Sequence, residues 1–140
     1  MLLYTLGRAA WTVHAVASDD GESCDVVDLL KSSGRHGTSM LAKLREVVPE
    51  KGPYLNEFSE ALRDGILEFR KPSGRGGTLR VLYFFAPNRV VVCACGVLKK
   101  TKKTPDDLID RAIAIHKRYE REVAANTVTV QPLPVEIENE

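Results

Sequence analysis

Hydrophobic and polar positions change their spacing about halfway along the chain. Residues 24–33 and 38–48 carry apolar side chains three and four positions apart, which is typical of amphipathic helices. Later, the segments 66–70, 78–86 and 89–98 are rich in β-branched and aromatic residues, and turn-forming residues connect them. The pattern therefore predicts two helices followed by an antiparallel three-stranded meander. We expect 78–86 in its centre because that segment is apolar on both faces.

Three further elements are predicted around this frame. Residues 11–18 indicate a first strand, and 54–64 indicate a short turn of helix. After the meander, 105–123 has the clearest helical pattern, with Thr104 expected as its N-cap and Pro105 at its first position. A chain of 140 residues is long enough for these elements to share one hydrophobic core.

Charge is distributed unevenly along the chain. The formal net charge is only +1, which by itself favours no class of partner. Between Ile66 and Thr104, however, nine basic residues stand against one acidic residue, so this stretch carries +8 and the rest of the chain carries −7. Such an asymmetry indicates an anionic partner for the basic stretch.

The basic stretch ends in a run of lysines. Four of them lie within the segment 99–103, here called the lysine loop, directly after the last predicted strand. In a hairpin centred on Arg75, Arg70 and Arg80 lie opposite each other, and such a like-charge pair costs up to about 1 kcal/mol unless an anion joins it. One reading is that carboxylates from the acidic N-terminal half pair with these arginines and that water solvates the lysines. The other is a cationic surface for a phosphodiester backbone, with Tyr83 on the opposite face of the strand from Arg80.

Several function classes find no support in the sequence. The three histidines have no metal-ligand spacing, and the three cysteines form neither a disulfide framework nor a zinc motif. The SGRGG stretch is followed by a strand instead of a helix, which favours a hairpin turn over a phosphate-binding loop. No secretory signal or membrane-length apolar run is present. We therefore expect a soluble, cytoplasmic protein without a metal or cofactor.

Two stretches resemble a known family. LEFRKPSGRGGTLRVLYFF (67–85) and GVLKKTKKTPDDLIDRAIAIHKRY (96–119) are similar to the phage-derived toxin-like family within the RelE/HigB/ParE superfamily. The resemblance implies an α+β, RelE-like fold of order β-α-α-β-β-β-α, with an antiparallel or mixed sheet, an N-terminal helix pair on one side, and a C-terminal helix. It implies a toxin domain over 11–124, with an N-terminal extension over 1–10 and a tail over 125–140. The composition of the tail, with two prolines, three glutamates and no basic residue, predicts an acidic, flexible segment in which TVTV can add an edge strand.

The resemblance also implies an activity. Relatives are toxins of type II toxin–antitoxin systems that cleave messenger RNA, free or on the ribosome, without a metal; a cognate antitoxin, often a helix-turn-helix protein of the HigA type, neutralises them. In this chemistry the ribose 2′-hydroxyl attacks the adjacent phosphate, so arginines can stabilise the added charge and a lysine can act as base. The expected catalytic residues are Arg70, Arg80, Lys99 and Lys100, and the expected RNA-binding residues are Arg75, Lys102 and Lys103.

One departure from the family pattern leaves alternatives open. Many relatives carry histidine where this chain has Cys95, so an acid–base group is missing at that position. A non-catalytic relative that binds RNA or the ribosome is one alternative. A ParE-like protein that acts on DNA gyrase is another, while a small interaction module without a nucleic-acid partner would leave the +8 stretch unexplained.

Overall fold

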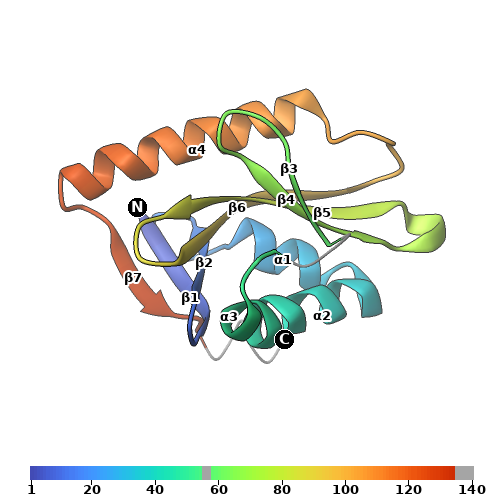
Figure 1. Ribbon diagram of the computed structural model, residues 1–140, viewed down its shortest axis with the longest axis horizontal. Helices are drawn as coiled ribbons and strands as arrows, with labels where there is room; N and C mark the ends of the chain where they lie inside the picture. The colour runs from blue at the N-terminus through green and yellow to red at the C-terminus, as the bar shows by residue number, and fades with distance from the viewer. Residues whose placement is uncertain (55–57, 135–140) are drawn as a thin grey trace.

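The computed structural model describes residues 1–54 and 58–134, and of Arg75 only the backbone. Figure 1 shows three layers: a central sheet, the N-terminal helices on one side, and the long C-terminal helix on the other. The chain is thus α+β, as the sequence predicts. None of the helices in the described ranges combines the length and the apolar surface that a membrane crossing requires.

The sheet has seven strands in the order β3-β4-β5-β6-β2-β1-β7. It is mixed, because β2 runs parallel to β6 and β1 runs parallel to β7, whereas the other neighbours are antiparallel. The strands are β1 (Leu2–Arg8), β2 (Thr12–Ala17), β3 (Ser59–Ala61), β4 (Leu67–Pro72), β5 (Thr78–Ala86), β6 (Val90–Lys99) and β7 (Thr129–Pro132).

The predicted meander is confirmed. β4, β5 and β6 are consecutive antiparallel neighbours, with β5 between the other two. Arg70 pairs directly with Arg80, which is the register that a hairpin centred on Arg75 requires. Between β5 and β6 the register shifts once, at Ala94, because Leu82 pairs with Cys95 while the next residue of β5 pairs with Cys93.

The helices follow the predicted order with shifted bounds. They are α1 (Asp25–Lys31), α2 (Gly34–Ala42), α3 (Val48–Lys51) and α4 (Asp106–Ala124), with a π-helical segment Lys43–Val47 between α2 and α3. The helix predicted to end at residue 48 continues to Lys51. Pro49 does not stop it because the proline lies where the π-helical segment gives way to α3: the Val48 N–H still bonds to the Lys43 carbonyl, and the missing N–H of Pro49 falls at the change of hydrogen-bond pattern.

Three strands lie where the sequence predicts no strand or only an optional one. The turn of helix predicted over 54–64 is wrong for its described part: Ser59–Ala61 forms β3 and pairs with β4, while 55–57 lie outside the described residues. Residues 2–8, assigned to an extension, form β1 between β2 and β7. The tail contributes β7 at the sheet edge; the remainder of the predicted flexible tail, 135–140, is not among the described residues.

The core has two parts, one on each face of the sheet. On the face covered by α1, α2 and α3, buried residues such as Leu30 and Met40 pack against Phe69 and Tyr83. On the other face, Ile109 and Ala112 of α4 pack over β5 and β6, against Leu82, Phe84 and Val92. Strand alternation therefore places Arg80 on the α4 face and Tyr83 on the helix-pair face, as predicted.

Candidate nucleic-acid interface

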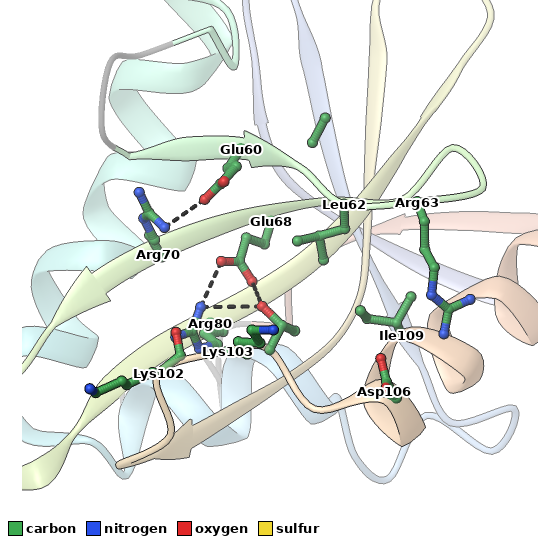
Figure 2. A pocket seen from close by; sticks show the side chains of 12 residues that line it. Glu60, Leu62, Arg63, Glu68, Arg70, Arg80, Lys102, Lys103, Asp106 and Ile109 are labelled. Carbon is green, nitrogen blue, oxygen red and sulfur yellow. Dashed lines mark hydrogen bonds and ion pairs between the residues drawn. The ribbon is translucent and has the colours of Figure 1, made fainter.

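Arg80 is a buried charge in the middle of the sheet. It lies on β5 and is only 4% exposed, since strand alternation aims it toward the loop that precedes α4. Its Nη1 donates to Glu68 Oε1 at 2.7 Å and to the hydroxyl of Thr104 at 3.2 Å. Its Nη2 donates to the carbonyl oxygens of Thr101 and Lys102, both at 3.2 Å. Figure 2 shows Arg80 and Glu68 beside Lys102 and Lys103 of the lysine loop.

Glu68 completes the cluster. It lies on β4, two residues before the partner of Arg80, so it reaches the arginine diagonally across the strands. It is 1% exposed, and its second carboxylate oxygen accepts a hydrogen bond from Thr104. Both terminal nitrogens of Arg80 and both oxygens of Glu68 are hydrogen-bonded, which offsets much of the cost of keeping these charges away from water, whereas Arg80 Nε has no partner among the described residues.

The sequence predicts Thr104 as the N-cap of α4, and this prediction is wrong. The N-cap position is Pro105, and the helix has no side-chain cap. The hydroxyl of Thr104 instead donates to Glu68 and accepts from Arg80. The carboxylates of Asp106 and Asp107 lie in the first turn, where they favour the positive end of the helix dipole.

Arg70 is the exposed counterpart of Arg80. It faces Arg80 across the two strands, and its side chain is 40% exposed. Its Nη1 forms an ion pair at 2.5 Å with Glu60 of β3. The expected pairing of the arginines with carboxylates is therefore observed, although the partners come from the neighbouring strands β3 and β4.

The four lysines of the lysine loop are exposed, and Lys100, Lys102 and Lys103 line one or both of two hollows. The α4 cleft, about 390 Å³, lies between the β3–β4 hairpin and the start of α4. Its charged lining residues are Glu60, Arg63, Glu68, Arg70, Arg80, Lys102, Lys103 and Asp106. The hairpin groove, about 630 Å³, lies between the β4–β5 turn and the lysine loop. Its lining residues are Pro72, Gly74, Gly77, Thr78, Arg80, Lys100, Thr101 and Lys102.

The two hollows differ in charge. Three carboxylates line the α4 cleft, and Glu60 and Glu68 already pair with its two sheet arginines. The residues lining the hairpin groove include no carboxylate, while Lys100 and Lys102 are basic and exposed. The hairpin groove is therefore the more favourable place for a phosphodiester.

The structure brings most of the predicted site residues together at the two hollows. Arg70, Arg80, Lys102 and Lys103 line the α4 cleft, and Arg80, Lys100 and Lys102 line the hairpin groove. Lys99 is the last residue of β6 and pairs with Thr78 at the edge of that groove. The backbone of Arg75 lies in the 3₁₀ turn Gly74–Gly76 at the tip of the hairpin.

Cys95 lies on the α4 face and is fully buried. Its thiol donates to the carbonyl of Leu108 at 3.8 Å, and burial raises the pKa of this thiol to about 12. A neutral, enclosed thiol offers neither a nucleophile nor a proton carrier at neutral pH.

The sequence analysis missed Glu60, Glu68 and the side-chain role of Thr104. A signal existed for Glu68, because it is the one acid in the +8 stretch and shares a strand face with Arg70. No comparable signal existed for Thr104, whose contact with Glu68 joins residues 36 positions apart.

Comparison with known families matches residues 28–117 to the model described as phage-derived protein Gp49-like (DUF891). The chain belongs to this Gp49-like family. The family is toxin-like and is associated with toxin–antitoxin systems. The match runs from α1 into α4 and includes every lining residue of the α4 cleft and the hairpin groove. No curated protein matches the chain.

Proposed function

We propose that this Gp49-like protein is the toxin of a type II toxin–antitoxin system and acts in the cytoplasm as a metal-independent endoribonuclease on messenger RNA. The observation that carries the proposal is the hairpin groove, which combines exposed lysines with a lining free of carboxylates. The toxin-like family supports the same reading. The resemblance to the RelE/HigB superfamily supplies the reaction class.

The chemistry assigns different tasks to the exposed cations. Cleavage requires a base for the ribose 2′-hydroxyl, an acid for the leaving oxygen, and positive charge near the phosphate. Lys99 and Lys100 lie where β6 leaves the sheet beside the hairpin groove, and we assign them to the reacting phosphate. Arg70 supplies charge from the α4 cleft, while Arg75, Lys102 and Lys103 hold flanking phosphates.

A cognate antitoxin follows from the same surface. A partner that inhibits the protein needs acidic side chains to cover the lysine loop, and electrostatic steering makes such association fast and dependent on salt. We propose a helix-turn-helix protein of the HigA type. Co-expression of a neighbouring reading frame of this kind is expected to restore growth and to co-purify with the chain.

A non-catalytic RNA- or ribosome-binding role is the second candidate. Cys95 favours it, because a buried thiol stands where many relatives carry histidine. The two candidates predict different fates for bound RNA: the nuclease cleaves it, whereas the binding protein leaves it intact.

Expression in a bacterial host tests the proposal. The wild-type protein is expected to arrest growth and to shorten messenger RNA, and the Lys99→Ala/Lys100→Ala variant is expected to do neither. The matched control is Lys51→Ala/Lys117→Ala, which removes two exposed lysines outside both hollows and keeps the arrest. Equal arrest by all three proteins would remove the lysine loop from the site.

A further inference from the structure

The lysine loop has no regular secondary structure beyond Lys99, yet its backbone is held at three places. In the middle, one guanidinium nitrogen of Arg80 donates to two successive carbonyl oxygens, those of Thr101 and Lys102. These are charge-assisted hydrogen bonds from a buried donor, which are stronger than neutral ones. They fix the backbone of the loop while leaving its lysine side chains in solvent.

The end of the loop is fixed through the same arginine. Thr104 donates to Glu68 and accepts from Arg80, while Glu68 accepts from Arg80 with its other oxygen. The three side chains therefore form a closed ring of hydrogen bonds. Because Arg80 and Glu68 are almost completely buried, the ring lies in a medium of low dielectric constant, where such bonds are strong and their geometry is restricted.

The start of the loop is fixed by close packing against the hairpin. Gly77 has φ +99°, and a Cβ atom at this position would lie 2.5 Å from the carbonyl oxygen of Lys99. The carbonyl of Gly77 is itself held by the backbone N–H and the hydroxyl of Ser73. Only glycine allows the turn to approach the loop this closely.

These contacts leave Arg80 no freedom to serve as a phosphate ligand. Both of its terminal nitrogens donate to protein acceptors, and its Nε, which has no partner among the described residues, is buried away from solvent. Moving the guanidinium toward a substrate would leave Glu68 as an unpaired buried charge, which is strongly unfavourable. A role that uses the observed geometry is therefore indirect.

We infer that Arg80, Glu68 and Thr104 are positioning residues that hold the lysine loop in one conformation beside the hairpin groove. This inference rests on the proposed function for the identity of the bound strand, and it replaces direct contact between Arg80 and the phosphate. A lysine displaced by about 1 Å from a reacting phosphate can cost up to 10²-fold in rate. The hydrogen-bonded ring therefore raises kcat indirectly, because it keeps the lysines in place beside the phosphate.

Trypsin sensitivity of the loop tests the inference without RNA. Thr104→Val keeps the shape and both charges but removes the hydroxyl, and Arg80→Lys keeps the charge but not the fork of donors. Cleavage after the loop lysines is expected to become about three- to tenfold faster in both variants, which is the range for losing one hydrogen bond. Cleavage after Arg89, in the turn at the far end of β5, is the internal reference.

Kinetics with RNA distinguish positioning from stability alone. Thr104→Val is expected to lower kcat about tenfold with KM changed less than twofold, and Thr104→Ser is expected to restore both loop protection and kcat. Thr38→Val, which removes a hydroxyl on α2, is the matched control.

The outcomes separate the inference from the proposed function. Unchanged loop cleavage in folded Thr104→Val and Arg80→Lys proteins would overturn the positioning role, whatever the activity. A wild-type protein that cleaves no RNA but whose loop opens in both variants would defeat the proposed nuclease and leave the positioning role standing.

Discussion

Two regions on opposite faces of the sheet, the aromatic stack around Phe69 and the ion pair of Arg80, are held together in different ways. On the helix-pair face, Phe69 stacks between Phe58 and Tyr83, with ring centroids 5.0 and 4.0 Å apart. On the α4 face, Arg80 and Glu68 form a buried ion pair. Aromatic burial has little directional demand and tolerates repacking, whereas the ion pair requires a fixed geometry. The directional contacts therefore lie where the lysine loop needs a defined position.

Phe69→Ala is expected to have the largest effect on stability. Phe69 is fully buried and contacts a ring on each side, so its truncation should lower the free energy of unfolding by about 4 kcal/mol. Chemical denaturation measures the change. Phe69→Leu, which keeps most of the volume, should recover more than half of the loss; an equal loss in both variants would show that this face also depends on specific geometry.

Arg80→Ala should cost about 3 kcal/mol, because it leaves Glu68 buried without its partner. We expect the low end of the range because removal of the Arg80 side chain would open the buried Glu68 to water from the α4 cleft, which both residues line. The double variant Glu68→Met/Arg80→Met removes both charges and should regain most of this stability while still freeing the lysine loop. If the lysine loop of the double variant stayed protected against trypsin, the buried ion pair would not be what holds the loop in position.

Stability at acidic pH probes a second buried polar group on the α4 face. Burial, and secondarily the charge of Arg8, lower the pKa of His14 to about 4 from its ordinary 6.5. The unfolded chain therefore binds a proton that the folded chain refuses, and stability falls as pH drops from 6.5 to 4. His14→Gln should remove this loss, which is about 3 kcal/mol for a pKa lowered from 6.5 to about 4. His36→Gln on α2 is the control, and identical pH profiles for wild type and His14→Gln would refute the assignment.

Gly77→Ala tests the approach of the hairpin to the lysine loop. The new methyl group would collide with the Lys99 carbonyl, and the positive φ adds strain, so a loss of about 2 kcal/mol is expected. Gly74→Ala is the matched control, since Gly74 also has a positive φ but has nothing within 4 Å of the added Cβ. The difference in thermal unfolding between the two variants isolates the steric contact, and equal losses would mean that the contact is soft.

Arg70→Ala should have the smallest effect, below about 1 kcal/mol, because its ion pair with Glu60 is open to solvent. The difference in the free energy of unfolding between Arg70→Ala and Arg80→Ala measures how much burial adds to the stabilising effect of an arginine–glutamate ion pair in this sheet. A loss as large as that of Arg80→Ala would place Arg70 in a structural role as well. Activity measured on the same protein shows whether Arg70 acts on the substrate.

The sequence predicts the parts of the fold that depend on neighbouring residues. The run from Val90 to Leu98, the turn at Arg75 and the acidic first turn of α4 are local signals, and the meander and α4 follow from them. β7 is a strand only through pairing with β1, which is distant in sequence, whereas β1 also pairs with its sequence neighbour β2 and is nevertheless not predicted. Glu60–Ala61 reads as helix by itself and becomes β3 through pairing with β4.

In the candidate site, too, the sequence predicts the strand register but not the side-chain contacts. A hairpin centred on Arg75 predicts that Arg70 pairs with Arg80, and the structure has this register. The difference in their burial does not follow, because it depends on Thr104 closing over one arginine and not the other. Charge count alone marks both arginines as candidates for the substrate, and only the contacts separate them.

Metal-independent cleavage of RNA can be measured with purified protein and an end-labelled single-stranded RNA in the presence of a metal chelator. The account predicts cleavage that leaves a 2′,3′-cyclic phosphate and a 5′-hydroxyl, lost in Lys99→Ala/Lys100→Ala and kept in Lys51→Ala/Lys117→Ala. RNA that stays intact while bound, or cleavage that the chelator abolishes, would contradict it.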